Sequence, residues 1–137
     1  MFTQKYMLDT CVCIEIMRGN LPNAFTQISM NGFDSYLISP IVAAELWTGV
    51  YKSKQINKNE LLLTNFLRPF TIVPFNVSCA RKYGQLRAFL EKEGIKIGNN
   101  DTLIAAQALS YEVGVITNNL KEFARVPDLD VQTWSKN

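Results

Sequence analysis

Three acidic residues are placed where their carboxylates could meet, and carboxylates are the groups with which this chain can do chemistry. Asp9 follows the apolar run Tyr6-Met7-Leu8, Glu45 lies inside an otherwise apolar segment, and Asp101 follows a Gly-Asn-Asn turn. Aspartate often only caps a helix or stabilises its amino end, so Asp9 and Asp101 each have an ordinary alternative role. Glu45 has no Lys or Arg within four positions, which excludes a helical ion pair as its partner.

Carboxylates that converge in one crevice repel one another unless a cation lies between them. A divalent ion with oxygen ligands removes the repulsion, and Mg²⁺, which Mn²⁺ can replace, is the ion that such ligands prefer. An ion of this kind stabilises charge on a phosphoryl oxygen and activates water, which suits cleavage of a phosphodiester bond. The pattern therefore predicts a magnesium site formed by Asp9, Glu45 and Asp101.

The composition narrows the chemistry further. The 137 residues include no histidine, which excludes Ser-His-Asp and Cys-His hydrolases, histidine-ligated zinc and acid–base catalysis by histidine pairs. Cys11, Cys13 and Cys79 are odd in number and lack the spacing of a disulfide framework, so we expect reduced thiols. The net charge of +2 neither indicates nor excludes a nucleic-acid partner.

The chain shows no sign of a membrane or export segment. No apolar run approaches the roughly 18 residues that cross a bilayer, and the apolar run before Asp9 is too short for a signal peptide. We therefore expect a cytoplasmic protein that makes no contact with membranes.

The segments that must position the acids alternate between strand and helix. Hydrophobic patterns predict strands at 6–8, 36–38, 71–73, 113–117 and around 131. They predict helices at 12–17, 22–28, 41–52, 60–66, from a cap at Asn76 or Ser78 to Glu93, and at 102–112 after a cap at Asn100. Ser39-Pro40 is a strong helix start, because serine caps free amides and proline at the first position loses no hydrogen bond.

This alternation implies right-handed crossovers and a parallel sheet sandwiched by helices, the α/β class. No repeat or linker divides the chain, so residues 1–137 are expected to form one domain. In such sheets ligands bind beyond the carboxyl ends of the strands. Asp9 and Asn118-Asn119 follow two of these ends, and Asp101 can face the same crevice.

Four stretches, in order and spacing, resemble the motifs of PIN-domain endoribonucleases of the VapC type, the toxins of type II toxin–antitoxin pairs. The stretches are Tyr6-Met7-Leu8-Asp9-Thr10, Ser39 to Leu46, Ile97 to Ala106, and Val115 to Phe123, with Trp134 near the end. They extend over nearly the whole chain. The resemblance implies a single PIN domain that acts as a magnesium-dependent endoribonuclease on RNA, with transfer RNA as a candidate substrate.

The same resemblance implies partners and site residues. It implies neutralisation by a cognate VapB-type antitoxin, a homodimer, and a hetero-oligomer with the antitoxin. The positions matching Asp9, Glu45 and Asp101 form the metal site of the family, and the position matching Asn119 is often a fourth aspartate. Here Asn119 is expected to assist the site without binding the ion through a charge. Cys11 is a second departure, because the family commonly has asparagine there.

A non-enzymatic alternative is a PIN-like domain that binds RNA or a protein without cutting RNA. The three acids argue against it, because binding alone gives no reason to gather negative charge opposite a polyanion. For the antitoxin we expect an apolar groove near Leu46 and Trp47, two side chains that could equally serve only in the core.

Overall fold

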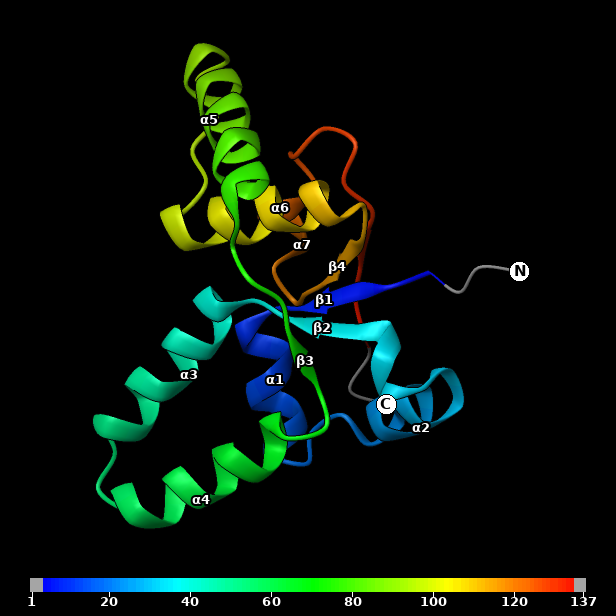
Figure 1. The fold of residues 1–137 in the computed structure, drawn as a ribbon, viewed down its shortest axis with the longest axis vertical. Helices are drawn as coiled ribbons and strands as arrows, with labels where there is room; N and C mark the ends of the chain where they lie inside the picture. The colour runs from blue at the N-terminus through cyan, green and yellow to red at the C-terminus, as the bar shows by residue number, and fades with distance from the viewer. Residues whose placement is uncertain (1–3, 135–137) are drawn as a thin grey trace.

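The computed structural model describes residues 4–134, which form a five-stranded parallel sheet with helices on both faces (Figure 1). The strand order is β3-β2-β1-β4-β5, so β1 is central and every neighbouring pair is parallel. The strands are β1 (Tyr6–Leu8), β2 (Tyr36–Ile38), β3 (Thr71–Ile72), β4 (Gly114–Ile116) and β5 (Val131–Gln132). The predicted α/β class is confirmed.

The helices divide between the two faces of the sheet. They are α1 (Thr10–Met17), α2 (Pro22–Asn31), the 3-10 turn η1 (Phe33–Ser35), α3 (Pro40–Tyr51), α4 (Ile56–Leu67), α5 (Val77–Lys92), α6 (Asn99–Tyr111) and α7 (Leu120–Phe123). In Figure 1, α1 to α4 lie on one side of the strands and α5 to α7 on the other. Among the described residues, no helix has both the length and the hydropathy to cross a membrane.

Two predicted helix starts are confirmed by their hydrogen bonds. Ser39 Oγ accepts from the amide of Ile41, 3.0 Å away, and Pro40 occupies the first helical position. Asn76, rather than Ser78, caps α5, because its Oδ1 accepts from the amide of Cys79 at 3.0 Å. A side-chain oxygen satisfies an otherwise unpaired amide at both helix starts.

Other boundaries differ from the prediction. Asn100 does not cap α6, which begins one residue earlier, at Asn99, with Gly98 at the cap position. Helix α4 begins at Ile56 rather than at 60, because the polar residues of its first turn carry no apolar period. Helix α7 and η1 were not predicted, since elements of four and three residues are too short to show a period.

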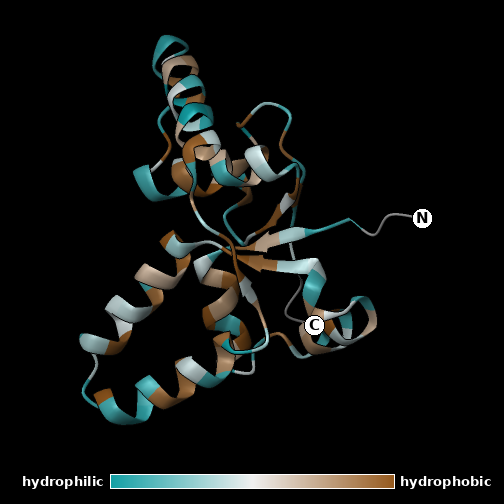
Figure 2. Cartoon of the chain, viewed as in Figure 1, coloured by the Kyte–Doolittle hydropathy of each residue, from teal (hydrophilic) through white to brown (hydrophobic). Residues whose placement is uncertain are grey.

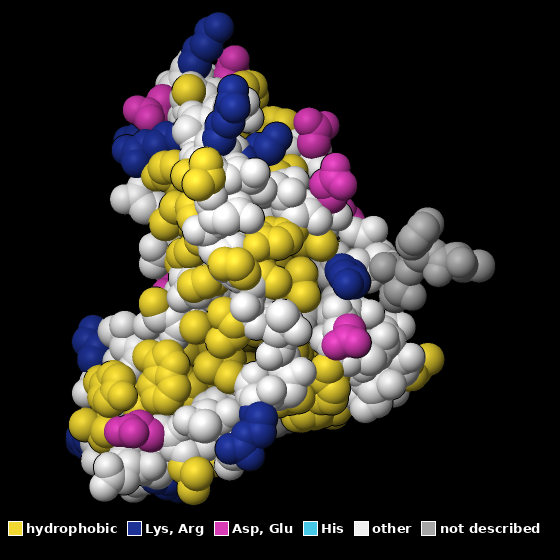
Figure 3. Space-filling view, viewed as in Figure 1, with side chains coloured by type: hydrophobic (Ala, Val, Ile, Leu, Met, Phe, Trp, Pro, Cys, Tyr) yellow, Lys and Arg dark blue, Asp and Glu magenta, His cyan; other side chains and the backbone are white. Residues whose placement is uncertain are grey.

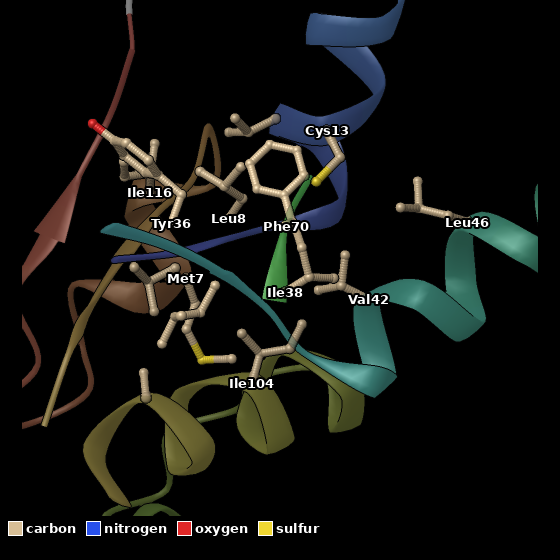
Figure 4. Packing of buried hydrophobic residues seen from close by; sticks show 14 of the residues in the cluster. Met7, Leu8, Cys13, Tyr36, Ile38, Val42, Leu46, Phe70, Ile104 and Ile116 are labelled. Atoms are coloured by element: carbon tan, nitrogen blue, oxygen red, sulfur yellow. The ribbon is translucent and has the colours of Figure 1, made fainter. Parts of the chain in front are cut away.

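The three inner strands, β2, β1 and β4, are buried between the two helical layers, whereas the short edge strands are more exposed. Met7, Leu8, Ile38 and Val115 are fully buried, and Figure 4 shows Met7, Leu8 and Ile38 packed with side chains from the surrounding helices. Figure 2 shows the same concentration of hydrophobic residues on the strands. Strands covered on both faces are expected to be apolar throughout. Polar residues begin where the strands end, and this places the candidate site at the carboxyl edge of the sheet.

Gly114 is required by a close approach at the start of β4. A Cβ there would lie 2.7 Å from the ring of Tyr6 and 2.9 Å from the carbonyl oxygen of Asp130. We expect Gly114→Ala to lower the free energy of unfolding, measured by denaturant titration, by about 1–3 kcal/mol, as overpacking does. The matched control is Gly84→Ala on α5, where a Cβ meets no atom within 4 Å. The control should be neutral or stabilising by about 0.5–1 kcal/mol, and equal stability of the two variants would contradict the assignment.

Candidate active site

Asp9 follows β1 directly and is only 5% exposed. Its Oδ1 accepts from the amide of Thr10 at 2.8 Å, and its Oδ2 accepts from the hydroxyl of Thr117 at 2.7 Å. A buried carboxylate must be met by donors, and these two come from α1 and from the residue after β4. The side chain of Asp9 is thereby fixed at the junction of two adjacent strands.

Glu45, which is half-buried on α3, is joined to the same region by Thr10. The Thr10 hydroxyl donates to Glu45 Oε1 at 2.8 Å, while the Thr10 amide donates to Asp9. The ion pairs among the described residues are Arg18–Glu15 and Arg87–Glu91, so neither involves Glu45. One threonine therefore orients two of the predicted site acids, and no basic side chain in the described part of the chain neutralises Glu45.

Asp101 lies in the first turn of α6 and faces the other acids. Burial, a hydrogen bond to Glu122 and the negative charges of Asp9, Glu122 and Glu45 raise the pKa of Asp101 to about 7. Asn119 Nδ2 also donates to Asp101 Oδ2 at 3.2 Å. The structure thus brings the three predicted acids close enough for their charges to act on one another.

The side chain of Asn119 lies between two acids. Besides Asp101, its Nδ2 donates to Oε2 of Glu122. Asn119 occupies the cap position of α7, but its side chain makes no capping hydrogen bond, and its backbone amide donates to Thr117 Oγ1 at 2.9 Å. The amide group of Asn119 therefore serves the acidic cluster rather than the helix end.

Glu122 also belongs to the acidic cluster, although the sequence pattern did not predict a role for it. Its Oε1 accepts from the amide of Gly98 at 2.6 Å. That bond, followed by hydrogen bonds to Asp101 and Asn119 and the charge of Arg125, holds the pKa of Glu122 below its usual range. The residue lies inside the Val115–Phe123 motif, but its direction depends on α7, which the sequence pattern did not reveal.

Asp9, Glu45, Asp101 and Glu122 form a cluster, but their side chains are not arranged to coordinate a metal ion. Within residues 4–134, no three His, Cys, Asp or Glu side chains surround one point closely enough to hold a metal ion. The donor chemistry suits Mg²⁺, because the available ligands are carboxylate oxygens, but Glu45 and Asp101 are held in hydrogen bonds to Thr10 and Asn119. Assignment of Asp9, Glu45 and Asp101 as metal ligands stays a prediction.

The profile of the PIN-domain family matches residues 6–129. The chain belongs to the PIN-domain family. Ribonuclease VapC2 of Rickettsia felis is 39% identical over 132 residues, which cover 96% of this PIN domain and 98% of the relative. The tRNA(fMet)-specific endonuclease VapC of Salmonella typhimurium is 32% identical over 130 residues, 95% of this chain and 98% of the relative.

A solved structure gives the same result. The crystal structure of VapBC2 from Rickettsia felis bound to a DNA fragment from their promoter contains a chain that superposes on this PIN domain with a TM-score of 0.89. The two chains are 37% identical, and the superposition covers 96% of this one and 100% of that one. The motifs predicted a VapC-type PIN domain, and this prediction is confirmed.

Cys11, one of the departures of this PIN domain from the family pattern, contacts the site. Its thiol donates to Asp9 Oδ2 at 3.4 Å, and its Sγ accepts from the amide of Asn118 at 3.4 Å. Burial raises the pKa of Cys11, which favours the neutral thiol. The thiol therefore links Asp9 to the segment that follows β4.

Replacement of Glu122 tests whether the acids act on one another as the geometry indicates. In Glu122→Gln we expect the pKa of Asp101 to fall from about 7 toward its ordinary range, because a neighbouring negative charge that raises it is removed and the hydrogen bond to position 122 is no longer to a charged group. The pKa is read from the carboxyl carbon resonance of Asp101 in an NMR titration. Glu93→Gln, an exposed position after α5, is the control and should leave the titration unchanged. An unaltered Asp101 titration in Glu122→Gln would remove Glu122 from the cluster.

Proposed function

We propose that this PIN domain is a magnesium-dependent endoribonuclease toxin, in which Mn²⁺ can substitute for Mg²⁺. The observation that carries the proposal is the hydrogen-bonded cluster of acids, in which Thr10 joins Asp9 to Glu45 and Asn119 joins Asp101 to Glu122. Carboxylates gathered in this way repel one another, and the raised pKa of Asp101 agrees with that. A divalent cation relieves such repulsion, and the relatives named above are ribonucleases. The substrate in this proposal is RNA, and the name of the Salmonella relative supports transfer RNA as its class.

In the proposed mechanism Asp9, Glu45 and Asp101 would hold the ion. A bound Mg²⁺ would supply Lewis-acid stabilisation of the phosphoryl oxygens and a water of lowered pKa. The surrounding residues fix the oxygens of the acids: Thr117 and Thr10 hold Asp9, and Thr10 also holds Glu45.

Asn119 has an auxiliary part in this mechanism. Its amide donates to Asp101 and Glu122, but it has no charge with which to bind the ion. Its contribution is to hold the Asp101 carboxylate in place beside the other acids. We therefore expect its replacement to weaken cleavage less than replacement of Asp9 or Asp101.

We also propose that a VapB-type antitoxin neutralises the protein by binding an apolar groove between α1, α2, α3 and α4. The groove has a volume of about 720 Å³ and is lined mainly by apolar side chains, with Glu45 among its lining residues. An antitoxin segment seated there could direct a basic side chain to that carboxylate. Leu46 lines the groove as well as the core, as expected, but Trp47 lies outside the lining. The proposal includes a homodimer and its hetero-oligomer with antitoxin.

Asp101→Asn tests the enzymatic proposal against a domain that only binds RNA. The substitution keeps the shape of the side chain and removes a charge that would hold the ion, so we expect cleavage of total cellular RNA in Mg²⁺ to fall by about a hundredfold or more. Circular dichroism should be unchanged. Asp34→Asn, an exposed position in η1, is the matched control and should cut at the wild-type rate. Equal cleavage by Asp101→Asn and wild type would refute the site, and a wild type that binds RNA without cutting it would favour the non-enzymatic alternative.

Two neighbouring leucines of α4 test the proposed antitoxin groove. Leu62 lines the groove and is 53% exposed, whereas Leu61 is 63% exposed and lies outside it. We expect Leu62→Glu to weaken binding of the cognate antitoxin by about tenfold or more, because a charge buried without a partner is unfavourable. Leu61→Glu should bind as wild type does. The measurement is isothermal titration of each variant with the antitoxin, and equal affinities would place the antitoxin elsewhere.

A further inference from the structure

Helix α3 carries an aromatic pair outside the apolar groove. The rings of Trp47 and Tyr51 are stacked, with centroids 5.9 Å apart and an interplanar angle of 23°. Trp47 is partly buried against the core, while Tyr51 is 58% exposed. The pair is therefore held from beneath by the core and presents an outer ring to solvent. We call these two residues the aromatic platform.

Unpaired positive charge follows the aromatic platform along the chain. Lys52, Lys54 and Lys58 are all exposed, and no acidic residue occurs between Glu45 and Glu60. None of the three lysines takes part in an ion pair within the described part of the chain. In Figure 3, the arm formed by α3 and α4 carries several apolar side chains among other groups and an acidic side chain, and Lys and Arg side chains lie at its margins. This end of the arm offers both a π surface and cationic groups.

The aromatic platform shares α3 with Glu45 but lies on another face of that helix. Glu45 and Tyr51 are six residues apart, which is a rise of about 9 Å and places them about 120° apart around the helix axis. The residues of α3 that line the apolar groove include Leu46, Gly49 and Val50, so the groove and the aromatic platform occupy different faces of this helix.

We propose that the aromatic platform, together with Lys52, Lys54 and Lys58, binds a single-stranded segment of the RNA substrate on the face of α3 outside the apolar groove. This inference rests on the proposed ribonuclease function. Bases of any sequence can stack on an aromatic ring, and lysines beside the ring attract the phosphates of the same strand. Surfaces of this composition suit unpaired RNA, because the bases of a duplex are already stacked on one another.

Binding is tested with the full chain carrying Asp101→Asn, a labelled single-stranded RNA oligonucleotide of mixed sequence and fluorescence anisotropy. Tyr51→Ala should weaken binding by about fivefold to a hundredfold, the usual effect of losing one stacked base. Tyr51→Phe keeps the ring and should bind like its parent. Phe89→Ala removes an exposed aromatic ring from α5 and is the control for nonspecific loss of apolar surface. Lys54→Gln should reduce both the affinity and its dependence on salt.

The outcomes separate this inference from the proposed function. If wild type cleaves RNA in Mg²⁺ while Tyr51→Ala binds as its Asp101→Asn parent does and, introduced alone into the wild type, leaves cleavage unchanged, the aromatic platform is overturned and the ribonuclease stands. If wild type neither binds nor cleaves RNA, both are overturned. Sedimentation of each variant provides a further test, because a change in molecular mass with Tyr51→Ala would identify this face as a contact between copies of the chain and overturn the RNA assignment. Loss of binding in Tyr51→Ala alone, at unchanged mass, supports it.

Discussion

The burial of one carboxylate, Asp9, at the end of the central strand is the constraint on which the site depends. An anion removed from water needs donors within hydrogen-bond distance, and the donors here are the amide of Thr10, the hydroxyl of Thr117 and, at a longer distance, the thiol of Cys11. Thr117 can reach Asp9 only because β4 lies beside β1 with Leu8 opposite Ile116. The register of β1 against β4 is therefore tied to the charge of a single side chain.

From Asp9 the polar contacts extend outward through neutral donors. Thr10 connects Asp9 with α3, and Asn119 connects the start of α6 with α7. These donors orient the acids but supply no positive charge, so repulsion among the carboxylates persists and appears as the raised pKa of Asp101. Hydrogen bonds thus orient the carboxylate oxygens of this network, but their negative charge is not neutralised. Such a set of oriented oxygens attracts cations.

The sequence was most informative where the signal is local. The apolar runs of β1 and β2 and the Ser39-Pro40 start depend on neighbouring residues, and the structure has them as predicted. The cap of α5 was predicted at Asn76 or Ser78, and the structure has Asn76. The meeting of the acids followed from the rule that ligands gather at the carboxyl ends of parallel strands. The role of Glu122 could not be predicted, because its bond to Gly98 spans 24 positions and depends on a four-residue helix. The hydrogen bonds that hold Glu45 and Asp101 likewise join residues far apart in the sequence, so no sequence pattern predicts them.

The two edges of the sheet have a consequence for how this protein associates with others. Both edge strands, β3 and β5, are two residues long, so each offers few unpaired backbone groups to an incoming chain. Short edges of this kind are a means by which proteins avoid sheet extension and amyloid-like aggregation. Recognition through side chains on the helices meets no such restriction. Substitutions on helix surfaces can change which partners bind this protein without disturbing the backbone hydrogen bonds of the sheet.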